Sequence, residues 1–389
     1  MMPSDWKHVR LDELSTTVTS GSRDWAKYYA DQGSKFIRMT NLQRDNIYLD
    51  LSDLKFVDVQ SDSSDGKRTS LKAGDILMSI TAELGKIGWV HEGLGESFIN
   101  QHTALIRLNE DLTCSKYIAY LLSSKTMNQK INRLNDSGAK AGLNLPTIRS
   151  IPLDIPTISE QRKIADILST WDKAISITEC QVENSKQQKK ALMQQLLTSK
   201  KRLLDDSGKP FEEEWKKVEL GKLLDYKQPT PYLVKSTEYS DEYTTPVLTA
   251  GKTFLLGYSN EDFGVFREDL PAIIFDDFTT ASKFVDFPFK AKSSAMKILI
   301  AKEGVSIKYI YEAMQVLNYP VGGHQRHWIS IFSNLVIGLP TLEEQQKIAA
   351  VLSNADKEVK ILEQQLADLK QEKKALMQQL LTGKRRVKV

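Results

Sequence analysis

The sequence KKALMQQLLT occupies residues 189–198 and occurs again, letter for letter, at residues 373–382. Extending the alignment in both directions without gaps pairs residues 156–202 with residues 340–386, and about 28 of these 47 positions are identical. Chance does not produce such a match, so the chain contains two copies of one element. We call the two segments the first and the second repeat.

Each repeat has the pattern of one long helix. It begins at Pro156 or Pro340, continues through acidic residues that suit a helix N-terminus, and then runs for about 40 residues without proline or glycine. Because an α-helix rises about 1.5 Å per residue, each helix would be on the order of 60 Å long. Such a helix can act as a spacer.

Apolar residues recur in both repeats at alternating spacings of three and four, which indicates a coiled-coil seam. An isolated helix of this kind most often forms a homodimer, but two copies within one chain can pair with each other. We therefore predict an intramolecular antiparallel pair of helices and a pseudo-twofold molecule. The predicted seam residues are Ile164, Leu168, Trp171, Ile175, Val182, Leu192 and Leu196, and then Ile348, Leu352, Val359, Leu362, Leu366, Leu369, Leu376 and Leu380.

Two lysines interrupt the apolar seam, and basic residues follow its end in each repeat. Lys189 and Lys373 fall on it, and we interpret them as side chains that extend along the helix to water, with an opening or a partner contact as the alternative. The basic ends at residues 200–202 and 384–386 suit helix C-termini, and phosphate binding is the less favoured interpretation.

A second, shorter match opens each half of the chain: Trp6, Val9, Leu11 and Leu14 correspond to Trp215, Val218, Leu220 and Leu223. The residues between this match and the repeat, which we call the first and second body, show no sequence alignment with each other. We predict that the two bodies occupy residues 1–154 and 205–338 and fold as two separate domains. The helical spacers then occupy residues 155–204 and 339–389.

Both bodies combine short strand patterns with helical ones. In the first body, FIRM at 36, DILMSI at 75, KIGWV at 86 and ALIRL at 104 are β-branched or apolar runs bounded by turn residues, which predicts strands. The segment from residue 113 has helical spacing. The second body repeats this character in PAIIFDD and MKILIA. The fold class we expect is α+β.

Polar loops interrupt the strands at residues 137–144, 280–284 and 322–328. Arginine and lysine suit guanine edges, and asparagine and glutamine suit adenine, so such loops could read DNA bases; a solvated surface turn is the alternative for each. The candidate DNA-binding residues are Arg38, Asn41, Lys86, Gln101, Lys140, Asn144, Lys283, Gln325 and Arg326.

Composition excludes several classes of protein. Of the 389 residues, 41% are hydrophobic and 26% charged, which is typical of a folded protein. The net charge of +3 is too small for a protein that binds nucleic acid by charge alone. No apolar run approaches the roughly 18 residues of a membrane span and no signal peptide is apparent, so we expect a cytoplasmic protein. The two cysteines, Cys114 and Cys180, cannot build a disulfide framework.

The sequence contains fragments of enzyme motifs, but none of these motifs is complete. Gly251, Lys252 and Thr253 match the last three residues of a phosphate-binding loop, but Pro246 stands where this motif requires its first glycine. His324 and His327 lack a third metal ligand, and no methyltransferase motif is present. We therefore expect no catalytic residues, no metal and no cofactor.

The whole pattern resembles the specificity subunits of type I restriction-modification systems, in which a variable target-recognition domain alternates twice with a shared long helix. The residues that carry the resemblance are Pro156, Thr157, Glu160, Gln161, Lys163 and Ile164, with their second copy Pro340, Thr341, Glu344, Gln345, Lys347 and Ile348. FIRMTNL at 36–42, GDILMS at 74–79 and FINQHTALIRL at 98–108 add to it in the first body. Residues 273–285 resemble a different recognition-domain subtype.

The resemblance implies a non-catalytic subunit that binds a bipartite target in double-stranded DNA. It also implies two methyltransferase subunits bound along the helices and, in the full complex, two ATP-dependent restriction subunits. The alternative is a coiled-coil adaptor or architectural protein without DNA-sequence specificity.

Overall fold

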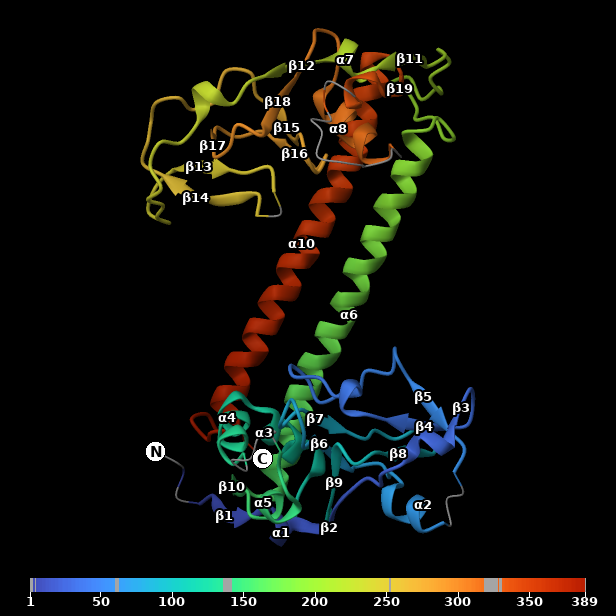
Figure 1. The fold of residues 1–389 in the computed structure, drawn as a ribbon, viewed down its shortest axis with the longest axis vertical. Helices are drawn as coiled ribbons and strands as arrows, with labels where there is room; N and C mark the ends of the chain where they lie inside the picture. The colour runs from blue at the N-terminus through green and yellow to red at the C-terminus, as the bar shows by residue number, and fades with distance from the viewer. Residues whose placement is uncertain are drawn as a thin grey trace. The chain divides into compact units, whose positions relative to one another are not determined.

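The computed structural model describes residues 3, 5–59, 63–135, 142–251, 253–317, 328 and 331–388. The chain divides into two compact units, which are residues 1–179 with 365–389 (unit 1) and residues 180–364 (unit 2). Each unit contains one body and part of each long helix (Figure 1). In the described residues, no helix is both long and apolar enough to cross a membrane.

The main sheet of unit 1 is antiparallel, with the strand order β2-β9-β6-β7. Every residue of β6 is buried, because β6 lies inside the sheet and helix α3 packs its apolar residues into the same core. The elements are β2 (Ser15–Ser20), β9 (Thr103–Leu108), β6 (Ile76–Ser79), β7 (Ile87–Trp89) and α3 (Ser115–Ser123).

A smaller sheet of unit 1 has the order β3-β5-β4-β8, in which only β4 and β8 are parallel. Trp25 packs against Phe36 and Phe98, with ring centroids 4.6 and 6.1 Å away, and fills its inner side. The strands are β3 (Tyr29–Ala30), β5 (Lys55–Val57), β4 (Ser34–Ile37) and β8 (Ser97–Ile99).

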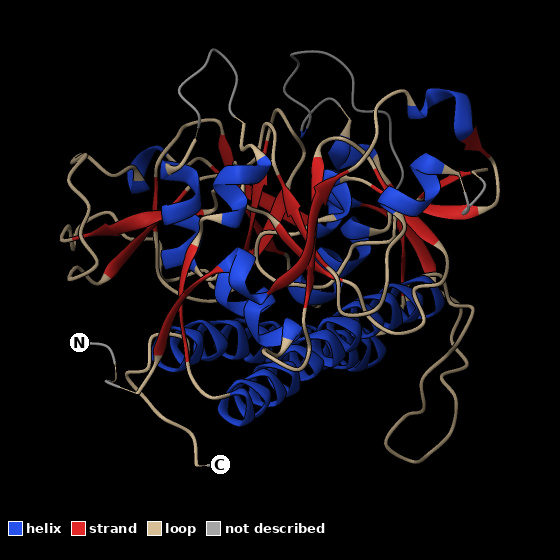
Figure 2. Cartoon of the chain, turned by 90° about the horizontal axis from the view of Figure 1, so that it is seen from below, coloured by secondary structure: helices blue, strands red, loops and turns tan. Residues whose placement is uncertain are grey.

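The rest of the first body is a two-stranded ribbon, short helices and the long loops drawn tan in Figure 2. The antiparallel ribbon of β1 with β10 brings the chain start to the beginning of the long helix. These elements are β1 (Lys7–Arg10), β10 (Pro152–Ile155), α1 (Leu11–Leu14), η1 (Trp25–Tyr28), η2 (Met39–Asn41), α2 (Ser64–Thr69), α4 (Lys125–Arg133) and α5 (Leu145–Arg149).

Unit 2 contains a main antiparallel sheet β12-β18-β15-β16, a smaller sheet β14-β13-β17 and a ribbon β11-β19. Their strands are β11 (Lys216–Glu219), β12 (Leu224–Lys227), β13 (Thr245–Leu248), β14 (Leu255–Ser259), β15 (Ala272–Asp276), β16 (Ser282–Val285), β17 (Lys290–Ala291), β18 (Met296–Ala301) and β19 (Val336–Leu339). The helices are α7 (Leu220–Leu223), η3 (Thr230–Tyr232), α8 (Ile307–Gln315) and η4 (Phe332–Asn334).

The two bodies share the topology of their main sheet and ribbon, which the sequence did not reveal. The main sheets have equivalent orders, each smaller sheet contains one parallel pair, and each body has a terminal ribbon. Helix α8 occupies in unit 2 the place of α3 in unit 1: the backbone N–H of Cys114 donates to Gln161, and that of Ser306 donates to Gln345, which is the equivalent repeat position. The two bodies therefore have equivalent arrangements of main sheet, ribbon and helix in spite of their unlike sequences.

The two repeats form the helices α6 (Ile158–Leu196) and α10 (Leu342–Leu380), each 39 residues long. Within each unit the helix segments run antiparallel. In unit 1, Glu179 pairs with Lys370 at 2.7 Å and Asp172 pairs with Lys373, while in unit 2, Lys186 pairs with Glu363 at 2.6 Å. The predicted α+β fold with an intramolecular helical pair is confirmed.

The predicted seam residues all lie on buried or half-buried positions of these helices. Ile164, Leu168, Val182, Leu196, Ile348, Leu352 and Leu380 are buried. The half-buried ones are Trp171, Ile175, Leu192, Val359, Leu362, Leu366, Leu369 and Leu376. At the ends of the helices, the seam residues belong to the buried apolar core of each body.

Candidate nucleic-acid interface

Three loops of the first body converge at the hairpin between β6 and β7. Thr81 lies in this hairpin, and its hydroxyl is 2.9 Å from Nδ1 of His102, which lies between β8 and β9. The Gln101 amide nitrogen is 3.1 Å from the other ring nitrogen of His102. An isolated bridge joins Thr81 to Gly142, which precedes α5. The sequence predicted Gln101 but missed Thr81 and His102, because only the sheet topology brings them together.

The same hairpin also carries charged side chains. The ammonium of Lys86 forms an ion pair with Glu83, and this hydrogen bond holds the pKa of Glu83 below its ordinary value. Arg44, which is exposed, donates to the carbonyl oxygen of Leu84 at 3.3 Å and to Asn128 at 2.8 Å. Lys86 is thus held in the loop cluster, and Arg44 is an exposed cation there that the sequence did not single out.

Gly85 allows this hairpin to approach α4. Its φ is +72°, and a Cβ at this position would lie 2.9 Å from the side-chain nitrogen of Asn128. That nitrogen donates to the Gly85 carbonyl at 2.7 Å. Any other residue would be strained and would push the hairpin away from the helix.

Arg38 and Asn41 form a structural turn. The guanidinium of Arg38 donates to both the backbone and the carboxylate of Asp53 at 2.9 Å. Asn41 is 2% exposed; its oxygen accepts from the Arg38 N–H at 2.9 Å, and its nitrogen donates to the Asp50 carbonyl at 2.7 Å. Asn41 was selected as a base reader because of its amide, but that amide is used inside the body.

One further candidate of the first body, Asn144, lies at the start of α5. Asn144 is exposed and caps this helix, because its side chain accepts from the Thr147 N–H at 2.8 Å. Lys140 lies outside the described residues.

In the second body, the hairpin between β15 and β16 is the counterpart of the β6–β7 hairpin. Lys283 lies on β16 with an exposed side chain, opposite Ile274 in the strand register. Gln325, Arg326 and the histidines 324 and 327 lie outside the described residues, as does Lys252. Trp328 is described, and its backbone N–H donates to Asp277 at 2.8 Å, beside this hairpin.

In each unit, an arginine at the end of one repeat pairs with a buried glutamate at the beginning of the other repeat. Arg202 forms two hydrogen bonds with Glu344, at 2.7 and 2.8 Å, and Arg386 forms two with Glu160, both at 2.7 Å. The two pairs occupy equivalent repeat positions, and both glutamate side chains are at most 2% exposed. These two arginines of the basic helix ends therefore have a structural role.

The seam lysines are also paired, which corrects our interpretation of them. Lys373 is 6% exposed and contacts Asp172, whose other oxygen accepts from the Tyr120 hydroxyl at 2.5 Å. Lys189 lies 2.5 Å from Asp356 and 3.5 Å from Glu312. Burial and the Asp172 carboxylate raise the pKa of Tyr120 far above its ordinary value, so the phenol stays a donor.

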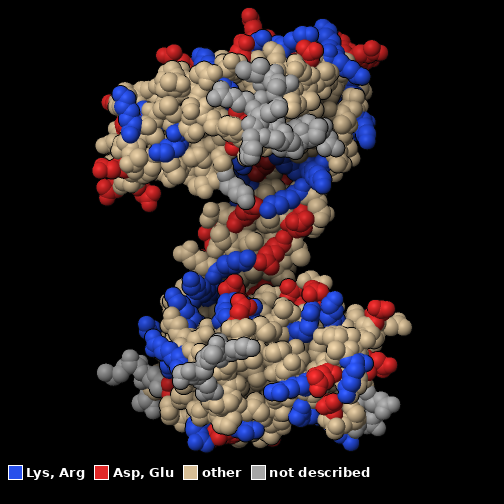
Figure 3. All heavy atoms as spheres, viewed as in Figure 1, with Lys and Arg blue, Asp and Glu red and all other residues tan. Residues whose placement is uncertain are grey.

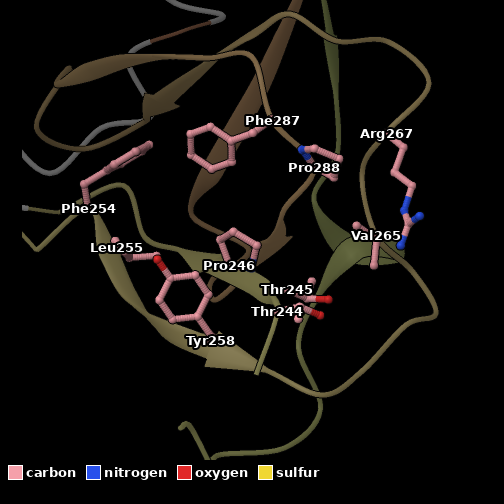
Figure 4. Close-up of a pocket in the computed structure, with 10 residues that line it drawn as sticks. All are labelled: Thr244, Thr245, Pro246, Phe254, Leu255, Tyr258, Val265, Arg267, Phe287 and Pro288. Atoms are coloured by element: carbon pink, nitrogen blue, oxygen red, sulfur yellow. The ribbon is translucent and has the colours of Figure 1, made fainter. Parts of the chain in front are cut away.

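A cavity of about 640 Å³ lies in the second body. Phe254, Tyr258 and Phe287 surround a common space, and Arg267 lies at its edge beside Val265 (Figure 4). None of the predicted site residues that the structure describes lines this cavity.

Positive and negative side chains are interspersed over both bodies on the face shown in Figure 3. This agrees with the small net charge of +3. The arrangement suits recognition through a few positioned side chains in the hairpin loops rather than through a uniformly basic surface.

Comparison with known proteins agrees with this architecture. The family model described as "Type I restriction modification DNA specificity domain" matches residues 3–185 and 212–371. The EcoR124I/EcoR124II specificity subunit of Escherichia coli is 48% identical over 147 residues, which are 36% of this chain and 36% of that protein. The alignment therefore spans little more than a third of that relative.

A putative type I restriction enzyme MjaX specificity subunit of Methanocaldococcus jannaschii is 25% identical over an alignment of 420 residues that covers 100% of this chain and 95% of that protein. The solved type I restriction-modification S subunit from M. genitalium has the same fold, with a TM-score of 0.67 at 14% identity and 96% coverage of both chains. The duplicated body-and-helix architecture and the family match lead to one conclusion: this chain belongs to the family of type I restriction-modification specificity subunits.

Proposed function

We propose that this chain reads a bipartite target in double-stranded DNA, with one half-site recognised by each body. The observation that carries the proposal is the pair of bodies with one main-sheet topology and unlike loop residues, each mounted on an equivalent end of the helical repeat. Equal topology gives both bodies the same way to approach a DNA groove. Unlike loops give each body its own base preference.

The β6–β7 hairpin cluster is the proposed reading surface of the first body. Lys86 and Arg44 can contact guanine edges or phosphates, and Gln101 can form a paired contact with adenine. Thr81 and His102 hold Gln101 in place. Asn144 and Arg38 remain proposed contacts at its margin, and Lys140 remains a proposed contact outside the described residues. The buried Asn41 is better explained as a structural residue.

The β15–β16 hairpin is the corresponding surface of the second body. Lys283 is exposed there, and the backbone N–H of Trp328 donates to Asp277 beside the same hairpin. Gln325 and Arg326 precede Trp328 in the sequence by three and two residues. We propose that Lys283, Gln325 and Arg326 read the second half-site together.

The long helices are proposed to fix the number of unread base pairs between the half-sites, since a helix is a rigid spacer. We further propose that two methyltransferase subunits bind along the helices, and that the full complex recruits two ATP-dependent restriction subunits. The chain itself would be non-catalytic, with the chemistry supplied by these partners.

The test is methylation sequencing of DNA from cells that express this chain with the methyltransferase subunit encoded beside it. A motif of two short half-sites separated by a fixed gap is expected. Methylation at a single contiguous motif would contradict two independent readers. No methylation in the presence of an active methyltransferase subunit would favour the coiled-coil adaptor.

A further inference from the structure

The two most exposed large hydrophobic side chains in the described part of the chain are Ile177 and Ile361, which are 60% and 66% exposed. Ile177 lies on α6 in unit 1, and Ile361 lies on α10 in unit 2. They occupy the same position of the two repeats, because the alignment pairs every residue of the first repeat with the one 184 positions later. The same outward position is therefore apolar in both helices.

A single exposed isoleucine is common in proteins and needs no explanation. Two exposed isoleucines at equivalent positions do need an explanation, because the two repeats differ most in their middle part, residues 170–188 and 354–372. Of the residues that stay identical here, Asp172, Glu179 and Lys186 form the ion pairs described above, as do their equivalents in the second repeat. The identical residues without such a role are Lys173, Ile177, Gln181 and Gln187, which are all exposed, with the counterparts Lys357, Ile361, Gln365 and Gln371.

Lys173 precedes Ile177 by four residues, and Lys357 precedes Ile361 by the same interval. Residues four apart lie next to each other on one helix face. Each helix therefore presents the same pair, an exposed isoleucine with an ammonium group one turn before it. Neither lysine forms an ion pair with a residue that the structure describes.

We propose that these two isoleucine–lysine pairs anchor two copies of one partner protein, one copy on each helix. Identical side chains at equivalent positions present the same chemistry twice, and so select the same partner surface twice. The complementary surface is an apolar pocket for the isoleucine with a carboxylate at its edge for the lysine. This inference rests on the proposed function, in which the two copies are the methyltransferase subunits.

The test uses full-length chains with Ile177→Ser, Ile361→Ser or both changes. Serine and isoleucine have similar helix propensities, and both side chains point outward, so the fold should be unchanged. Leu112→Ser is the matched control, because Leu112 is 53% exposed in the first body and has no counterpart in the repeats. Each protein is mixed with the methyltransferase subunit, and the mass of the complex is measured by light scattering across a concentration series.

The unchanged chain and Leu112→Ser should bind two methyltransferase subunits. Each single change should weaken one site roughly tenfold to a hundredfold, so that a complex with one subunit dominates at intermediate concentration. The double change should weaken both sites. Lys173→Glu and Lys357→Glu should act at the same sites, with a stronger effect at low salt.

Two subunits bound with unchanged affinity by the double variant would overturn the inference and leave the proposed function intact. Failure of the unchanged chain to bind any methyltransferase subunit would instead contradict the proposed function. A chain that forms homodimers, and loses them on the double change, would identify a second copy as the occupant and overturn the choice of partner.

Discussion

The contacts between body and long helices differ in the two units, although they lie at equivalent positions of the repeats. In unit 1, the buried pair of Lys373 with Asp172 is completed by a neutral phenol, that of Tyr120 on α3. In unit 2, the equivalent pair of Lys189 with Asp356 faces Glu312 on α8, a carboxylate that is 0% exposed. Aligning α3 with α8 places Tyr120 and Glu312 at one position.

The additional negative charge of unit 2 is balanced by an additional positive one. Lys308 lies 2.7 Å from Glu312 and 3.2 Å from Asp356, so unit 2 contains a network of two lysines and two acids. At the equivalent position, the described part of unit 1 has only one lysine and one acid, Lys373 and Asp172. The comparison shows that one helical element can accept different bodies, provided that the contacting body helix brings a charge-balanced set of side chains.

The largest expected difference between the units comes from removing the seam lysines. Lys373→Met leaves Asp172 buried without a cation and should destabilise unit 1 by about 3–5 kcal/mol. Lys189→Met should cost about 1–2 kcal/mol, because Lys308 remains beside Asp356. Urea unfolding with hydrogen exchange resolved by unit measures both. An equal cost for the two changes would show that Lys308 does not compensate.

The arginine–glutamate pairs should give a smaller difference. Arg386→Ala removes the hydrogen bonds that the buried Glu160 and the exposed Asp5 accept from this guanidinium, and we expect a loss of stability. After Arg202→Ala, the indole N–H of Trp215 still donates to Glu344 at 3.1 Å, so the loss should be about 1 kcal/mol smaller. Thermal unfolding of both variants provides the measurement, and Trp215→Phe combined with Arg202→Ala should remove the difference.

The exposed interhelix pairs should show almost no effect. Lys186 and Lys370 form ion pairs with side chains that are all about half exposed, so Lys186→Ala and Lys370→Ala should each change stability by less than about 0.5 kcal/mol. A loss above about 1 kcal/mol for either variant would mean that these pairs are less screened by solvent than their exposure indicates.

Much of this architecture was predictable from the repeats, because near-verbatim duplication and heptad spacing are direct signals of paired helices. The common topology of the bodies was not, since short strands constrain only which side chains alternate. One signal was present: the tripeptide Lys-Tyr-Ile occurs at residues 116–118 and again at residues 308–310, on the equivalent helices α3 and α8.

The candidate site was harder to predict than the fold. A loop sequence shows which side chains can hydrogen-bond, but it does not show whether they face solvent or the backbone of their own turn. Asn41 illustrates the inward case, and the convergence of Gln101, Thr81 and His102 illustrates contacts that only the sheet topology creates. The ion pairs of the seam lysines were missed because the sequence alone does not fix the register of two antiparallel helices.

The central claim, that each body reads its own half-site, is tested most directly by methylation sequencing of Gln101→Ala and Lys283→Ala beside the unchanged chain. We predict that Gln101→Ala relaxes base preference in one half of the motif and Lys283→Ala in the other, with the gap length the same in all three. Equal loss at both halves in either variant would contradict the account.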